Sequence, residues 1–314
     1  MFDLHRLRIL QAVSRYGSLS GAAEALYLTA SAVSQQLSKL ETEAGQKLLE
    51  RQGRGVRLTD AASLLVSHAD RILSLVEQAE ADLEEKKGAV IGSLTLGAFA
   101  TAARSLLPRV LRDLQDRHPG LAVSLQELEP EHALTGVIRG TLDLSVVVAW
   151  ANAPMEISDD LTREVLFTDC ADLALPLDHP LAERESVSLE EFQDQAWISW
   201  PQGSICHHWL VLTLRGLGTE PQIVHTALEH ATQVALVEAG LGAAVLPRLG
   251  RGPLPEGVRI VPVVPALERQ VFAVWRKDAG RRPAITALVD ALRHHASHQL
   301  VDTEIEQESH QPPS

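Results

Sequence analysis

The sequence predicts a multidomain chain: a small, mostly helical winged helix-turn-helix module, one long helix, and a two-lobed α/β domain. Three observations predict this order. Residues 1–60 show short helices followed by an arginine-bearing hairpin pattern, residues 61–88 show one long heptad pattern, and from Gly92 onward β-rich runs alternate with helical ones. The 314 residues suffice for two or three domains of roughly 150 residues each.

Composition indicates an ordinary globular protein. Hydrophobic residues make up 45% and charged residues 22% of the chain, a balance typical of folded domains. The longest apolar run, residues 146–151, is far shorter than the ~18 residues of a membrane-spanning helix. Charges interrupt the amino terminus within three residues, so we expect no signal peptide, a cytoplasmic location and no membrane partner. Cys170 and Cys206 form neither a metal half-site nor a disulfide framework.

The charges are unevenly distributed. The net charge is −13, but residues 1–60 contain eight Lys and Arg against six Asp and Glu. A slightly basic amino-terminal module on an acidic body is typical of a DNA-binding domain joined to a domain that does not contact DNA.

Residues 4–45 have the pattern of three helices. The first begins at Leu4 and stops at Gly17. Ser20 is expected to cap a second helix over residues 21–26, and Thr29 a third that ends at Gly45. The third helix has a predicted buried stripe, which consists of Val33, Leu37, Leu40 and Ala44.

The opposite face of the third helix carries short hydroxyl and amide groups at helical spacing, Ser31, Ser34, Gln35 and Ser38. Such groups hydrogen-bond phosphates and base edges, and Gln suits the N6/N7 edge of adenine. Together with the two shorter helices, this face predicts the reading helix of a helix-turn-helix. An ordinary helical hairpin in a core is the alternative that this face alone leaves open.

Residues 48–59 form two short extended segments around a glycine-containing turn, with Arg51, Arg54 and Arg57 at the bend. Guanidinium groups beside a reading helix can hold phosphates or enter the minor groove. The segment is therefore predicted to be the wing.

A dense pattern covers the whole module. It comprises Leu4-x-x-Leu7-x-x-Leu10, Gly17-Ser18-Leu19-Ser20-x-Ala22-Ala23-x-x-Leu26, Ser31-Ala32-Val33-Ser34-x-Gln36-Leu37-x-x-Leu40-Glu41, Gly45-x-x-Leu48-Leu49-x-Arg51 and Leu58-Thr59. In this pattern the chain resembles the LysR-type transcriptional regulators. The resemblance implies DNA contacts from Thr29, Ser31, Ala32, Ser34, Gln35, Ser38, Lys39, Arg51, Arg54 and Arg57. Ala30, Gln35 and Ala62 depart from the family's usual Gln, Arg and Gly, so the preferred DNA sequence is not carried over.

Thr59 is expected to cap a long helix that reaches about Lys87. Its apolar residues follow a 4-3-4-3-4 spacing, a heptad seam, and they are Leu65, Ala69, Ile72, Val76, Ala79 and Leu83. Either the chain's own core or a second subunit must cover this seam, and we favour a second subunit. The helix resembles the family's linker helix, which implies a homodimer or homotetramer.

After Gly92, strands are expected at residues 94–98, 121–127, 142–149, 165–167, 172–175, 197–199, 243–246 and 269–275, and a last helix at 283–298. Strands alternating with helices predict a mainly parallel sheet. With Leu106-Leu107-Pro108, His118-Pro119, Gly140-x-Leu142-Asp143, His179-Pro180-Leu181 and the glycine-containing run at 237–247, this part resembles the family's periplasmic-binding-protein-like (type 2) effector domain.

The resemblance implies a DNA-binding domain, a linker helix and an effector domain. Residues 1–60 form the DNA-binding domain, 61–88 the linker helix and 89–301 the effector domain. Within the last, lobe I comprises 89–161 and 266–301 and lobe II 162–265, with crossings near 161–165 and 265–269. The acidic tail, residues 302–314, is expected to be disordered.

Enzyme signals are weak. The sequence contains no GxSxG, HExxH or GxxxxGK. Gly240-Leu241-Gly242 follows a helix and enters a strand, the wrong order for a phosphate-binding turn. His207, His208, His225 and His230 lack zinc-site spacing. We therefore expect no catalytic residue, no metal and no cofactor.

A ligand site can be argued from two loops. Each leaves a strand and opens a helix, one at Ala100 and Thr101 and the other at Ser199, Pro201, Gly203 and Ser204. Helix amino termini offer free N–H groups, and the hydroxyls add to them, so the loops would form an anion or carbonyl site between the lobes. His230 could line the same cleft. The alternative is that Thr101 and Ser204 only cap helices.

Together these features predict a transcriptional regulator that binds double-stranded DNA, a small organic acid or carbonyl compound, a second copy of itself and RNA polymerase. The alternative from another class is a cytoplasmic solute-binding protein or an enzyme that uses the α/β cleft directly. The winged module distinguishes them, since neither alternative needs one.

Overall fold

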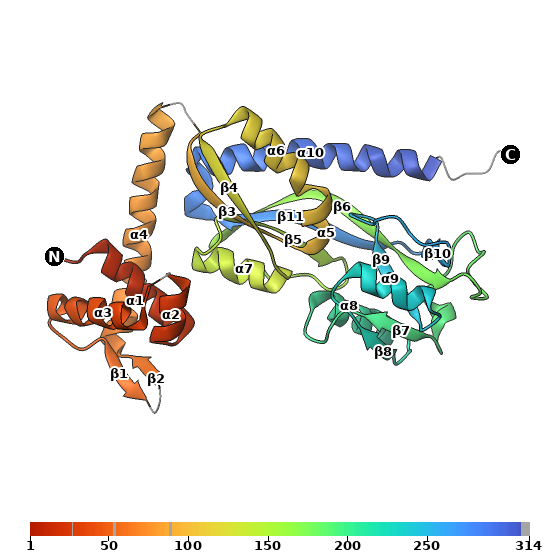
Figure 1. The fold of residues 1–314 in the computed structure, drawn as a ribbon, viewed down its shortest axis with the longest axis horizontal. Coiled ribbons are helices and arrows are strands. Elements are labelled where there is room, and N and C mark those ends of the chain that lie inside the picture. Colours follow the sequence, from red (N-terminus) through yellow and green to blue (C-terminus); the bar gives the residue numbers. More distant parts are fainter. Residues whose placement is uncertain (27, 53–54, 88–89, 309–314) are drawn as a thin grey trace. The chain divides into compact units, whose positions relative to one another are not determined.

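The computed structural model describes residues 1–26, 28–52, 55–87 and 90–308; their side chains are described except at 51–52, 55, 74, 77–78, 80–82, 84–87 and 298–308. The chain divides into two compact units, Met1–Lys87 and Gly88–Ser314, which are considered separately (Figure 1). No helix in the described part of the chain combines the length and apolar character of a membrane span.

The first unit consists of helices and one hairpin. Its elements are α1 (Leu4–Tyr16), α2 (Leu19–Ala25), α3 (Ala30–Ala44), β1 (Leu49–Gln52), β2 (Gly55–Leu58) and α4 (Asp60–Lys87). Leu10, Val33 and Leu40 are fully buried in one core that also includes Ala69 of α4. The predicted stripe of α3 lies in this core, although Ala44 is only partly buried.

Local hydrogen bonds begin and end these helices as predicted, with one exception. Thr29 Oγ1 accepts from the Ala32 amide at 3.1 Å, and Gly45 ends α3 with φ +70°, a conformation that glycine adopts without strain. The cap of α2 is Ser18, whose Oγ accepts from the Gly21 amide at 3.0 Å. The prediction that Ser20 caps α2 is wrong, because the residue with the extended backbone before the helix is Ser18. Ser20 already lies inside the helix.

The second unit is built on a nine-stranded sheet of order β4-β3-β5-β11-β6-β9-β7-β8, with β10 paired to β6. Its strands are β3 (Gly92–Ala98), β4 (Leu121–Glu127), β5 (Leu144–Trp150), β6 (Leu161–Pro176), β7 (Ala196–Ser199), β8 (Gln222–Thr226), β9 (Ala243–Pro247), β10 (Val258–Val261) and β11 (Leu267–Arg276). Its helices are α5 (Ala100–Ser105), α6 (Leu107–Arg117), α7 (Pro130–Arg139), α8 (Ile205–Gly216), α9 (His230–Glu238) and α10 (Pro283–Glu308), with short 3-10 helices at Leu189–Phe192 and Lys277–Arg281.

The sheet is mixed rather than mainly parallel. β3 pairs in parallel with β4 and β5, and β7 with β8 and β9. The long strands β6 and β11 run antiparallel to each other and to the other strands with which they pair. The expectation of a mainly parallel sheet is wrong here. The two strands that cross between the lobes, β6 and β11, run in opposite directions, and both are antiparallel to their other neighbours in the sheet.

Two lobes with separate cores share the long strands. In lobe I, α6 and α10 lie on one face of the sheet and α7 on the other (Figure 1). Along β6, Phe167 belongs to the core of lobe I and Ala171 to that of lobe II. Along β11, Leu267 belongs to lobe II and Val271 to lobe I. The change from one core to the other therefore falls at residues 168–170 on β6 and at residues 268–270 on β11.

Four further elements, β6, β8, β10 and α10, differ from expectation. Residues 161–176 form one long strand where two were predicted, and the short strands β8 and β10 were not predicted. Between β3 and β4 the chain forms two helices, α5 and α6, which meet at Leu106. The last helix, expected at residues 283–298, continues to Glu308 and so into the segment for which disorder is expected. Residues 309–314 lie outside the described part.

Candidate functional site

The predicted reading face of α3 is open to solvent. Ser31, Ser34, Gln35, Ser38 and Lys39 are exposed, whereas the opposite side of the helix lies in the core. The Ser38 hydroxyl donates to the Ser34 carbonyl oxygen at 3.0 Å, and the Thr29 and Ser31 hydroxyls lie 2.9 Å apart. Thr29 caps the helix, and Ala32 is partly buried next to it. The face is thus polar, short-chained and accessible.

Arg6 and Glu41, to which the sequence assigns no role of their own, connect α3 to its neighbours. Arg6 of α1 donates from Nε to Gln36 Oε1 at 3.2 Å and forms an ion pair with Glu43. Glu41 joins α3 to the wing because its Oε1 accepts from the backbone amide of Leu48 at 2.9 Å. Its Oε2 also accepts from Lys47 at 2.8 Å. Partial burial raises the pKa of Glu41, but these hydrogen bonds outweigh it and hold the pKa below its usual value.

The wing is the antiparallel hairpin of β1 and β2, with Leu49 opposite Leu58. The Arg57 guanidinium is exposed and lies 3.3 Å from the Glu50 carboxylate on the facing strand. Arg54 and the side chain of Arg51 lie outside the described residues. The structure therefore places one of the three predicted wing arginines on the surface of the hairpin.

The predicted dimerisation seam has two different halves. Ala69 is fully buried, and Leu65 and Ile72 are partly buried, all against the core of their own unit. Further along α4, Val76 is partly buried, Ala79 is exposed, and 62% of Leu83 is exposed. The first half of the seam thus packs, at least in part, against its own unit, and its role in holding a second subunit stays a prediction.

At the boundary between the lobes, Thr101 contacts a buried ion pair. Arg269 of β11 and Asp169 of β6 are cross-strand partners. The two side chains lie 2.7 Å apart and are 3% and 5% exposed, which places both charges out of water. An N–H of Arg269 donates to Thr101 Oγ1 at 3.1 Å. The Thr101 hydroxyl, which does not cap α5, can still donate its own hydrogen.

The Arg269 guanidinium also lies against two aromatic rings. It is 5.4 Å from the ring centre of Phe99 and 5.7 Å from that of Trp150, within the range of cation–π attraction. Trp150 in turn stacks on Trp209 of α8, with ring centres 3.6 Å apart. Arg269 therefore connects residues of both lobes at the crossing strands.

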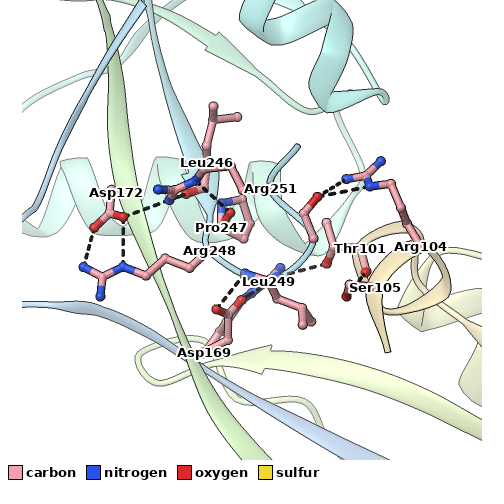
Figure 2. A network of polar contacts seen from close by, with 12 residues as sticks. Thr101, Arg104, Ser105, Asp169, Asp172, Leu246, Pro247, Arg248, Leu249 and Arg251 are labelled. Carbon is pink, nitrogen blue, oxygen red and sulfur yellow. Dashed lines mark hydrogen bonds and ion pairs between the residues drawn. The ribbon is translucent and has the colours of Figure 1, made fainter. Parts of the chain in front are cut away.

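A second cluster of charges adjoins the first (Figure 2). Asp172 accepts two hydrogen bonds from Arg248, at 2.8 and 2.9 Å, and one from Arg251 at 2.8 Å. Arg104 of α5 donates to the carbonyl oxygen of Gly250 at 2.9 and 3.1 Å. These contacts bring together four arginines and two carboxylates, so their combined charge is positive. The arginines are Arg104, Arg248, Arg251 and Arg269, and the carboxylates are Asp169 and Asp172.

His230 faces the same positive charges. Burial lowers its pKa to about 4, and the positive charges of Arg269, Arg104 and Arg251 add to the effect. The imidazole is therefore neutral at pH 7. Both ring nitrogens are buried without a hydrogen-bond partner among the described residues. The ring packs edge-on against Trp200 with centres 5.9 Å apart.

In the second-lobe loop, Ser204 acts as a helix cap. Its Oγ accepts from the His207 amide at 3.2 Å and donates to the Pro201 carbonyl at 2.9 Å. The buried Ser199 hydroxyl lies 3.4 Å from His207 Nδ1. Gly203 is exposed with φ +96°. The structure gives no direct contact between Ser204 and Thr101, so their joint role stays a prediction.

Nucleophile and metal chemistry find no support in the described residues. No group of three or more His, Cys, Asp or Glu there could hold a metal ion. Burial raises the pKa of Cys206 to about 11 and also raises the pKa of Cys170, so neither thiol is activated.

Strand periodicity could have revealed the buried ion pair. Leu267, Arg269 and Val271 alternate with exposed residues on β11, and Phe167, Asp169 and Ala171 alternate with exposed or partly buried residues on β6. A charged residue in the inward phase of a strand is costly unless it is paired. Neither position belongs to a known motif, so strand periodicity is the signal that points to them.

The fold and these sites define a class of protein: a winged helix-turn-helix module and a long helix joined to a two-lobed α/β domain of the ligand-binding type. Two family models match. Residues 4–63 match the bacterial regulatory helix-turn-helix protein of the lysR family, and residues 87–297 match the LysR substrate binding domain. The chain belongs to the LysR family of transcriptional regulators, as the sequence resemblance predicted, and is not an enzyme.

Relatives agree with this assignment. The chain is similar to the probable HTH-type transcriptional regulator LrrA of Synechococcus elongatus, with 31% identity over 94% of this chain and 97% of the relative. It is also 31% identical to a probable RuBisCO transcriptional regulator of Synechocystis over 77% of this chain and 71% of the relative.

Solved structures share the predicted fold class. A full-length OxyR variant from Pseudomonas aeruginosa has a TM-score of 0.68 and 24% identity, covering 93% of this chain and 98% of its own. Full-length BenM has a TM-score of 0.59 and 23% identity, covering 95% and 98%.

Proposed function

We propose that this LysR-type regulator binds a specific DNA sequence through α3 and the wing and responds to a small organic anion bound between its lobes. The working state is a cytoplasmic homodimer or homotetramer. Its subunits are held together through the outer half of the α4 seam, and the oligomer contacts RNA polymerase at the promoter. The observation that carries the effector class is the positive cluster around Thr101 and His230.

The chemistry of the cluster favours an acidic effector. Arg104, Arg251 and Arg269 surround a neutral imidazole whose ring nitrogens have no partner among the described residues. A carboxylate entering there gains charge-assisted hydrogen bonds, and its oxygen can accept from the Thr101 hydroxyl. A neutral carbonyl compound, the other class that the sequence allows, would gain less from the same arginines.

The effector part is tested by calorimetry on wild-type protein and Thr101→Val, with acids suggested by genes adjoining the bound DNA sites. Losing the hydroxyl should weaken binding by about 1.5–3 kcal/mol for a charged effector and about 0.5–1.5 kcal/mol for a neutral one. DNA binding without effector should be unchanged. Equal affinities for both proteins would place the effector elsewhere, and no binding by any candidate would indicate a regulator without a ligand.

The DNA part is tested by a salt titration of wild-type protein against Arg54→Ala. Removing one phosphate contact should weaken binding to all sequences and flatten the salt slope by about one unit. Arg112→Ala, in the second unit, is a matched control because it removes the same charge from an exposed ion pair with Asp116. An unchanged slope for Arg54→Ala would remove the wing from the DNA interface.

A further inference from the structure

The segment of residues 248–251 leaves lobe II and enters lobe I. It follows β9, a strand of the second lobe. Leu249 is 5% exposed and belongs to the same hydrophobic core as Leu106 and Val148 of lobe I. Its amide donates to Asp169 Oδ1 at 3.0 Å. A side chain supplied by one lobe thus completes the core of the other.

The next residue brings the two lobes into backbone contact. Gly250 has φ +67°, and a Cβ placed on it would lie 2.8 Å from the carbonyl oxygen of Thr101. Arg104 of lobe I donates two hydrogen bonds to the Gly250 carbonyl, at 2.9 and 3.1 Å. A residue with a side chain could not make this approach without displacing α5.

The base of the segment is held firmly in lobe II (Figure 2). The Arg248 amide donates to the Cys170 carbonyl at 2.8 Å, and the Arg248 guanidinium binds Asp172. Arg251 binds the same carboxylate and donates to the Leu246 carbonyl at 2.6 Å. The contacts to lobe I therefore extend from a fixed base rather than from a loose loop.

From these contacts we propose that residues 248–251 are an interlobe latch, which holds the lobes together without a ligand and must be released or shifted when their relative angle changes. Asp169 connects the latch to the candidate effector site, because it accepts from the Leu249 amide and pairs with Arg269, which binds Thr101. The latch itself does not depend on the proposed function; only its link to an effector, through Asp169, Arg269 and Thr101, rests on it.

Two leucine truncations of equal size separate a latch from an ordinary core residue. Leu249→Ala removes the side chain inserted into lobe I. Leu246→Ala is the matched control, since Leu246 is also buried but in a core cluster of lobe II itself. Hydrogen exchange of the full-length protein without effector or DNA, followed by mass spectrometry, reports on peptides covering α5 and residues 246–252.

For Leu249→Ala we expect exchange in α5 to become more than tenfold faster than in the wild type. Leu246→Ala should accelerate exchange within lobe II and leave α5 unchanged. Equal acceleration of α5 by both variants, or no change with Leu249→Ala, would overturn the proposal.

A second pair keeps the proposal testable if Leu249→Ala fails to fold. Arg104→Met retains the aliphatic stem but removes both donors to Gly250, and it should accelerate exchange at residues 248–252, across the lobe boundary. Arg112→Met removes an exposed ion pair on α6 and should have no such effect. Identical exchange at residues 248–252 in Arg104→Met and wild-type protein would overturn the latch. A gel shift on the same samples reports DNA binding separately, so failure of the latch and failure of the proposed function remain distinguishable.

Discussion

The outer half of the α4 seam allows a sharp test of self-association. Leu83 is 62% exposed within its own chain, whereas fully burying a leucine side chain is worth about 1.5–3 kcal/mol. Covering the exposed part by a partner therefore contributes about 1–2 kcal/mol per chain, and about 2–4 kcal/mol for the two copies of a symmetric dimer. Leu83→Glu removes this contribution and places two like charges near each other.

The dimer dissociation constant should then rise by at least about 30-fold, and by up to about 1000-fold, as measured by sedimentation equilibrium over a concentration series. Ser67→Glu is the control, because it adds the same charge to an exposed position on the opposite side of the helix. Ile72 is a poorer choice, since it packs against the core of its own unit. A Leu83→Glu protein with the wild-type dissociation constant would show that the outer seam does not hold the subunits together.

Three further results are expected. Arg269→Met should lower the free energy of unfolding by about 3–5 kcal/mol in urea titrations, because it leaves the Asp169 carboxylate buried without its partner; a loss below 1 kcal/mol would contradict this. The pKa of His230 is about 4 in the folded chain and about 6.5 in the unfolded chain. As the pH falls, the unfolded chain therefore takes up a proton first. The free energy of unfolding should fall by about 3 kcal/mol between pH 6.5 and pH 4. His230→Phe should lose less over that window, and parallel pH profiles would refute the assignment. Gln35→Ala should change the preferred base at one position by about 1–3 kcal/mol in binding-site selection, while an unchanged consensus would exclude Gln35 from base reading.

Local signals explain why the first unit was predictable. Helix ends depend on residues adjacent in sequence, such as Thr29 and Gly45, and the buried stripe of α3 follows directly from helical spacing. The misplaced cap of α2 shows the limit of this reasoning, because Ser18 and Ser20 both suit a cap and only the backbone conformation distinguishes them.

The second unit depends on pairings that no local pattern specifies. β6 and β11 were expected as shorter pieces, yet their antiparallel pairing produces the ion pair of Asp169 and Arg269. These residues are 100 positions apart, and each becomes informative only when the other strand is placed beside it. β8 was missed because its five residues carry no strong apolar alternation.

The seam on α4 shows a related limit of sequence patterns. Heptad spacing predicts that Leu65, Ala69 and Ile72 need a partner surface, but it does not say which surface. In the structure the core of the first unit supplies it for these residues. The outer residues, Ala79 and Leu83, remain exposed within the chain.

The most direct test of the central claim is selection of DNA by the purified full-length protein from sheared fragments of the genome that encodes it. At roughly 50 mM salt we expect a small set of fragments to be enriched, each sharing one sequence, with affinity falling steeply as salt rises. Gel-shift titration of an enriched fragment against a shuffled sequence should then give at least a thousandfold preference. If no fragment is enriched and no shift appears at low salt, the chain is not a sequence-specific DNA-binding regulator.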